Sequence, residues 1–260
     1  MLSDQNRQYA ADAILAAEKT RKVCPQPSAT WPEMTLEDAY DVQRRWAEAR
    51  IAAGAKIVGR KIGLTSRAMQ QASKMTEPDY GVILDDALFQ DGARIAAGTF
   101  IKPRLEVELA FVMGSDLSGA GCHIHDVMRA TEFVQPALEI IDYRTEVPRQ
   151  IVDTIADNAA FGAIVLGGRT IRPFDVDLRR VGATLSQNGV IEESGLAAAV
   201  MGHPAAGLAW LVSKLAAQGD GLKAGDIVLG GAFARPVDIR PGDVIAADYG
   251  DLGSIGVSFA

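Results

Sequence analysis

Cysteine is scarce in this sequence. Only two of the 260 residues are cysteines, Cys24 and Cys122. They lie far apart along the chain and in no spacing typical of metal ligands, so neither a disulfide framework nor a zinc knuckle is indicated. Both are expected to be ordinary reduced thiols.

Long apolar runs are also lacking. No run approaches the roughly 20 residues that a membrane-spanning helix requires. The first residues, MLSDQNRQYAADAIL, contain acids and amides where a secretory signal would be apolar. We therefore expect a cytoplasmic protein.

An excess of positive charge is absent as well. Lys and Arg number 26 against 33 Asp and Glu, so the net charge is −7, and it is spread along the chain. Proteins that bind nucleic acid or anionic membranes usually carry an excess of positive charge, so neither is expected as a partner. The sequence also contains no P-loop and no strand-associated G-x-G-x-x-G, which argues against a nucleotide cofactor.

Histidine is rare, and its three positions suggest structural roles. His123 and His125 flank an expected helix start, and His203 precedes Pro204. Capping or surface positions are therefore expected rather than metal ligation. The string Gly253-Ser254-Ile255-Gly256 falls short of a nucleophile elbow, so a serine hydrolase is not indicated.

The N-terminal part of the sequence predicts helices. Residues 4–22 are rich in alanine, and the following CPQPSATWP is expected to be irregular. Thr35 and Asp38 form a capping box before a long helical run that Gly54 can end. We predict a helical segment over 1–55 and one catalytic core over 56–260.

After residue 55 the pattern changes to short β-rich runs separated by turn residues. Two hairpins are predicted, one at Asn188-Gly189 and one around Tyr249-Gly250-Asp251. Strands and helices do not alternate regularly, which disfavours a TIM barrel or a doubly wound sheet. The fold class predicted is α+β, with a β-rich core and N-terminal helices.

Two glutamates share one face of a predicted strand. In Arg104-Leu105-Glu106-Val107-Glu108-Leu109 side chains alternate, so Glu106 and Glu108 point the same way. A solvated outer sheet face would explain this pair equally well. Glu139 favours a site instead, because it falls in VQPALEII, a run that is largely apolar.

Three converging carboxylates would be driven to protonate unless a cation lay between them, because burial and mutual repulsion both disfavour ionisation. A divalent metal resolves this conflict. An all-oxygen set selects a hard ion, Mg²⁺ or Mn²⁺, over zinc.

A second group of polar residues surrounds Lys61. Gly59 to Ser66 read as a strand followed by a turn into a helix, and a helix N-terminus with a nearby lysine can bind a carboxylate. A plain turn, with Ser66 as N-cap and Lys61 exposed, is the simpler interpretation from the residues alone. Asp79 is, on the same footing, a turn aspartate.

Several motifs together resemble a known family. The chain is similar, in family order and over nearly its whole length, to the hydratase and decarboxylase branch of the fumarylacetoacetate hydrolase superfamily. The motifs are KIGLTSRAM, EPDYGVILDD, PRLEVELAFV, PALEIID, DTIADNAA, GDIVLGGAFARPV and DYGDLGSIGVSF.

The resemblance implies roles for individual residues and a mixed, β-rich core that is roll-like or barrel-like. It implies metal ligation by Glu106, Glu108 and Glu139, and catalytic roles for Lys61 and Asp79. Substrate-binding positions implied by the same resemblance are Leu64, Thr65, Asp157, Asn158 and Ala159.

The resemblance also implies a reaction and an assembly. Hydration of a 2-oxo-enoate or 2-hydroxy-dienoate, with 2-oxohept-4-ene-1,7-dioate as substrate, is expected in the meta-cleavage degradation of aromatic compounds. Decarboxylation of 4-oxalocrotonate, hydration of 2-hydroxypentadienoate, hydrolysis of an acylpyruvate and a non-catalytic binding module stay open as alternatives. A homo-oligomer, pentamer or decamer, is implied as well. For a diacid, one arginine is expected to hold the distal carboxylate, and the candidates are Arg60, Arg67, Arg144 and Arg235.

Overall fold

The computed structural model describes the backbone of residues 1–260 and every side chain except that of Ala72. The predicted N-terminal helices are present as α1 (Asp4–Thr20) and α3 (Leu36–Ala52), and α3 starts at the predicted capping box. The intervening stretch was predicted to be irregular, but it contains the short helix α2 (Pro27–Thr30). Proline at the first helical position accounts for this helix, because its missing N–H has no partner there anyway.

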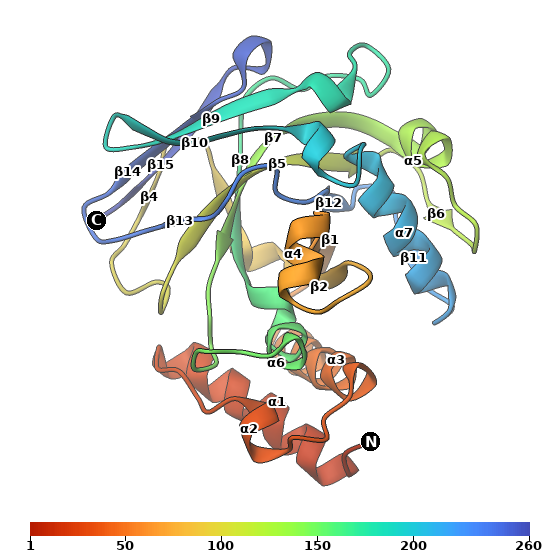
Figure 1. Cartoon of the computed structure of the whole chain (residues 1–260), viewed down its shortest axis with the longest axis vertical. Coiled ribbons are helices and arrows are strands. Elements are labelled where there is room, and N and C mark those ends of the chain that lie inside the picture. Colours follow the sequence, from red (N-terminus) through yellow and green to blue (C-terminus); the bar gives the residue numbers. More distant parts are fainter.

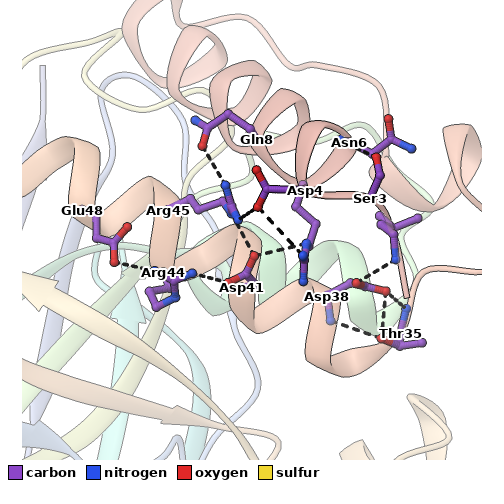
Figure 2. Close-up of polar contacts among 12 residues, drawn as sticks. Ser3, Asp4, Asn6, Gln8, Thr35, Asp38, Asp41, Arg44, Arg45 and Glu48 are labelled. Atoms are coloured by element: carbon purple, nitrogen blue, oxygen red, sulfur yellow. Dashed lines mark hydrogen bonds and ion pairs between the residues drawn. The ribbon is translucent and has the colours of Figure 1, made fainter.

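Charged and capping contacts join α1 to α3 (Figure 2). Arg45 of α3 donates to Asp41, one turn before it, and to Gln8 of α1. Asp38 accepts hydrogen bonds from the Thr35 backbone and hydroxyl, and from the backbone N–H of Leu2 at 2.9 Å. The N-terminal segment is therefore tied to the start of α3 as well as packed against it.

The main sheet holds the two glutamate-bearing strands at its centre. Its order is β2-β1-β12-β5-β7-β8-β3, with β13 paired to β5. Its strands are β1 (Ile57–Gly63), β2 (Asp79–Leu84), β3 (Leu88–Gln90), β5 (Arg104–Met113), β7 (Thr131–Ile141), β8 (Phe161–Leu166), β12 (Ile227–Leu229) and β13 (Val237–Asp238). In the described chain this sheet runs from β2 to β3 without closing into a barrel.

A second sheet covers one side of the first and contains both predicted hairpins. Its order is β10-β9-β14-β15-β4, and a two-stranded ribbon pairs β11 with β6. Asn188 and Gly189 both have positive φ at the β9–β10 turn, as a type I′ hairpin requires. The strands are β4 (Ala93–Ile95), β6 (Leu117–Ser118), β9 (Gly182–Gln187), β10 (Val190–Leu196), β11 (Gly221–Leu222), β14 (Val244–Asp248) and β15 (Ser254–Phe259).

The remaining helices occupy two ends of the molecule. Helices α5 (Ile124–Ala130) and α7 (Ala205–Ala216) lie beside the sheets, and α4 (Arg67–Ala72) follows β1 (Figure 1). Helix α6 (Ile151–Ala156) packs against α3 and α2 at the opposite end (Figure 1). No described helix is both long and apolar enough to cross a membrane.

The apolar core divides along the main sheet. One face of β5 contributes Leu105, Val107, Leu109 and Phe111 to the core between the sheets. The other face carries Ala110, which packs with Ala137 and Leu229 from neighbouring strands. The α+β prediction is confirmed. The division at residue 55 stays a prediction.

Candidate active site

Strand pairing brings the three glutamates together on the second face of the main sheet. Glu106 of β5 lies directly opposite Glu139 of β7, and Glu108 lies opposite Ala137. Directly opposed residues point to the same side of a sheet. One oxygen from each of the three carboxylates lies within 4.8 Å of the others.

These carboxylates are buried rather than solvated. Glu106, Glu108 and Glu139 are 6%, 1% and 0% exposed, so the alternative of a solvated outer face is wrong. The apolar side chains that share this face keep water away from them. Burial and the repulsion of Glu139 raise the pKa of Glu106 to about 8, and burial also raises the pKa of Glu108 and Glu139.

The protein itself satisfies these oxygens poorly. Glu108 Oε2 accepts a hydrogen bond of 2.8 Å from the backbone N–H of Gly231. Neither oxygen of Glu139 accepts a hydrogen bond from any described group. Buried acceptors are rarely left without a partner, so this arrangement is suited to a cation held between the three side chains.

Lys61 supplies the positive charge nearest to the glutamates. It is buried on β1, so its exposed turn position, the simpler sequence interpretation, is wrong. Its Nζ lies 3.2 Å from Glu139 Oε1 and donates to the carbonyl of Ala159 at 3.1 Å. Burial alone would lower the pKa of Lys61, but the charges of Glu139 and Asp79 outweigh burial and raise it.

Asp79 lies beside Lys61 at the start of β2. It pairs with Gly63 of β1, it is 2% exposed, and its Oδ1 has no hydrogen-bond partner among the described residues. A Cβ on Gly63 would come within 2.2 Å of that oxygen and 3.2 Å of Lys61 Nζ, so glycine is needed there. Burial raises the pKa of Asp79.

A left-handed turn presents the carbonyl that Lys61 binds. Asn158, Ala159 and Ala160 have φ of 51°, 50° and 60°, a conformation that costs about 1–2 kcal/mol for each non-glycine residue. The Asn158 side chain holds this turn by bonding both the N–H and the carbonyl of Val82, at 2.8 and 2.9 Å. Strain of this kind is retained where neighbouring structure enforces it, commonly at functional sites.

The other implied substrate positions lie around this centre. Leu64 follows β1 with φ of 54°, and the buried Thr65 packs against Gly231, whose N–H holds Glu108. The Asp157 carboxylate accepts from the backbone N–H of Arg144 at 2.8 Å and pairs with its guanidinium. Ser66 caps α4, as the plain-turn interpretation predicted. The substrate roles of Leu64, Thr65, Asp157, Asn158 and Ala159 stay predictions.

Sequence reasoning missed Gly231 and Gly63, which shape the site without charged atoms. Gly231 has φ of 122° and a Cβ there would lie 2.2 Å from Thr65 Oγ1. The Gly230-Gly231 pair after an apolar strand was the available signal for a close backbone approach. The sequence around Gly231 did not indicate which carboxylate would accept a hydrogen bond from its backbone N–H.

Comparison with known proteins agrees with this geometry. Residues 52–259 match the family described as fumarylacetoacetate (FAA) hydrolase C-terminal. The chain is 51% identical to 2-oxo-hept-4-ene-1,7-dioate hydratase of Escherichia coli over 256 residues, which cover 96% of each protein. It is 37% identical to 2-keto-4-pentenoate hydratase of Paraburkholderia xenovorans (strain LB400), over 99% of this chain and 96% of the relative.

Among solved structures, 4-oxalocrotonate decarboxylase from Pseudomonas putida G7, complexed with magnesium and adipate, superimposes with a TM-score of 0.97. That match covers 100% of this chain and 99% of the other at 36% identity. Both the sequence match and the superposition include the strands that carry the glutamates. The chain therefore belongs to the fumarylacetoacetate hydrolase family.

Proposed function

We propose that this protein is a metal-dependent hydratase of 2-oxo-enoates, with 2-oxohept-4-ene-1,7-dioate as its substrate. The observation that carries the proposal is the buried Glu106, Glu108 and Glu139 cluster with Lys61 against it. The 51% identity to a hydratase of this diacid, over nearly the whole of both chains, supports the substrate.

Glu106, Glu108 and Glu139 are suited to hold Mg²⁺ or Mn²⁺. The donor set is all oxygen, and both Glu139 oxygens are buried without hydrogen bonds from described groups. When bound, the metal would supply Lewis-acid stabilisation of negative charge on the substrate's 2-oxo group. The solved relative that contains magnesium supports the same choice of ion.

Hydration requires protons to move along the substrate. A proton leaves carbon 3 and another is added at carbon 5, which brings the double bond into conjugation with the 2-oxo group. Hydroxide then adds at carbon 4 and a proton at carbon 3. Asp79 is the candidate proton carrier, because its Oδ1 is free of hydrogen bonds from described groups and its raised pKa, caused by burial, favours reprotonation.

Lys61 keeps its positive charge throughout this sequence. Its buried ammonium lies beside Glu139 and is held in place by the Ala159 carbonyl. A fixed charge of this kind offsets the negative charge that develops as the enolate forms. Since the site is closed to water on its apolar side, that stabilisation is stronger than it would be at the surface.

Decarboxylation of 4-oxalocrotonate is the second candidate, favoured by the TM-score of 0.97 to a decarboxylase. Loss of carbon dioxide would produce a similar enolate, so one site can serve either reaction. Pure protein with Mg²⁺ should be incubated separately with 2-oxohept-4-ene-1,7-dioate, 2-hydroxypentadienoate, 4-oxalocrotonate and fumarylpyruvate. The hydratase proposal would be overturned if the protein released carbon dioxide from 4-oxalocrotonate or cleaved fumarylpyruvate but hydrated neither 2-oxohept-4-ene-1,7-dioate nor 2-hydroxypentadienoate.

We also infer that the chain forms a homo-oligomer. Strand β10 is an edge of the second sheet, and it exposes Val190, Ile191 and Leu196 by 61%, 65% and 55%. Apolar side chains along an open edge favour association with another chain. Light scattering at micromolar concentration tests this inference, and a monomeric mass would contradict it.

A further inference from the structure

Three of the four arginines considered for a distal substrate carboxylate are paired with carboxylates of the protein. Arg144 is buried, and its guanidinium forms an ion pair with Asp157. Its backbone N–H also donates a hydrogen bond to the Asp157 carboxylate. The ion pairs of the other two are Arg60–Asp220, at 3.3 Å, and Arg235–Glu193, at 2.7 Å. Arg67 is exposed on α4.

A different arginine, Arg149, is buried with little compensation for its charge. Its side chain is 9% exposed, and its guanidinium stacks 3.8 Å from the centre of the Tyr143 ring. Among described groups its one hydrogen bond is a long one, 3.4 Å from Nη1 to Asp157 Oδ2. Asp157 is already held by Arg144, so one carboxylate is shared by two guanidinium groups.

This shared pairing leaves Arg149 with N–H donors that no described group accepts. A guanidinium has five such donors, and none of the unpaired ones on Arg149 is fully enclosed, so they remain open to an anion from solvent. Burial lowers the pKa of Arg149. An anion arriving beside it would supply both the missing acceptors and the missing charge.

Contacts connect Arg149 to the catalytic centre. Asp157, which it touches, begins the turn whose Ala159 carbonyl binds Lys61. Lys61 in turn lies 3.2 Å from Glu139 Oε1, so a short series of contacts leads from Arg149 to the glutamates.

The ring on which Arg149 stacks is also linked to the glutamates. Tyr143 lies two residues past the end of β7, the strand that carries Glu139. Arg149 stacks on this ring, so its guanidinium lies near the end of β7 that carries Glu139.

We propose that Arg149, positioned by Tyr143, binds the distal carboxylate of a dicarboxylate substrate whose 2-oxo acid end lies at the glutamate cluster. This proposal rests on the proposed function and names the residue that selects a diacid over a monoacid. A planar guanidinium matches a carboxylate through two parallel hydrogen bonds, which a monocarboxylic substrate cannot use.

The test compares two substrates in one set of variants. For wild type and Arg149→Met, kcat/KM is measured with 2-oxohept-4-ene-1,7-dioate and with 2-hydroxypentadienoate. We expect Arg149→Met to reduce the diacid-to-monoacid ratio by about tenfold to a hundredfold, the range for hydrogen bonds to charged groups. Arg235→Met is the matched control, because it removes an exposed arginine that is already paired, and its ratio should equal that of wild type.

Folding is checked separately. Circular dichroism and Mg²⁺ affinity report whether Arg149→Met retains the centre, and Arg149→Lys, which keeps the charge opposite Asp157 but loses the planar fork, should give an intermediate ratio. An equal loss for both substrates, or a wild type that hydrates the monoacid but not the diacid, would overturn the subsite while leaving the hydratase function intact. Absence of hydration of either substrate by wild type would instead overturn the proposed function, and this subsite with it.

Discussion

Lys61 Nζ lies 3.2 Å from Glu139 Oε1, and both side chains are almost completely buried. The lysine comes from β1 and the glutamate from β7, with β12 and β5 between them in the sheet. Lys61 therefore reaches across the shared face of the sheet to the glutamate, and its charge is the nearest that the chain supplies to the carboxylate cluster.

Replacing Lys61 by methionine should lower kcat by about a hundredfold to a thousandfold. The fixed positive charge that offsets the developing enolate would be lost while most of the side-chain volume is kept. Steady-state kinetics with the diacid measures this effect. Lys56→Met removes an exposed lysine just before the same strand and should leave kcat unchanged. Retention of near wild-type kcat by Lys61→Met would contradict the catalytic role.

Removal of divalent metal with EDTA should abolish activity, and Mg²⁺ or Mn²⁺ should restore it. Glu108→Gln should weaken metal binding at least about tenfold, because a charged ligand becomes neutral at almost constant shape. Calorimetric titration with Mn²⁺ measures this affinity without relying on turnover. Glu132→Gln alters an exposed glutamate at the start of β7 and serves as control. Full activity after metal removal would contradict the metal-dependent mechanism.

Gly231→Ala should weaken metal binding as well as stability. Its Cβ would lie 2.2 Å from Thr65 Oγ1, so the backbone must move, and the N–H that holds Glu108 moves with it. Gly54→Ala is the matched control, because its φ of 108° is equally unfavourable for alanine but no atom lies within 4 Å of the new Cβ. Urea unfolding should show a loss of about 1 kcal/mol for Gly54→Ala and clearly more for Gly231→Ala. Only Gly231→Ala should change Mn²⁺ affinity.

Asp38→Asn should destabilise the protein at neutral pH by about 1 kcal/mol, through the capping box at the start of α3. Burial alone would raise the pKa of Asp38, but hydrogen bonds from Thr35 and Leu2 lower it below its usual value. The ionised carboxylate therefore stabilises the folded state above about pH 4, and this contribution is lost as pH falls through the lowered folded pKa.

Urea unfolding at neutral pH and below about pH 4 measures this difference. The difference in the free energy of unfolding between wild type and Asp38→Asn should become smaller on acidification. Glu37→Gln, an exposed charge change in the same helical turn, should show a much smaller gap at neutral pH. A gap that is unchanged by acid would show that the ionised form of Asp38 contributes nothing to stability.

Local sequence signals were enough for several elements of the fold. The capping box at Thr35 and the Asn188-Gly189 turn appear where they were predicted, because a side-chain cap and a positive-φ turn depend on residues close together in the chain. The common face of Glu106 and Glu108 also follows from the two-residue period of a strand.

Other features depended on contacts between distant segments. The sequence placed Glu139 in an apolar strand, but only the pairing of β5 with β7 sets it opposite Glu106. Judged only from their neighbours in the sequence, Lys61 and Asp79 were interpreted as ordinary turn residues. Their burial and their proximity to other charges depend on segments that are distant in the chain. The same holds for Arg149, which only the fold distinguishes from the arginines first considered.

The amino-acid sequence by itself determined the helical N-terminal region, the β-rich remainder and the carboxylates able to bind a metal, because these follow from periodicity and side-chain chemistry. Only the tertiary structure decided that the glutamates are buried together with Lys61, Asp79 and a left-handed turn at Asn158. The physical reason is that desolvation and charge–charge interaction act through space. They depend on which strands become neighbours, and strand order is set by packing of the whole chain.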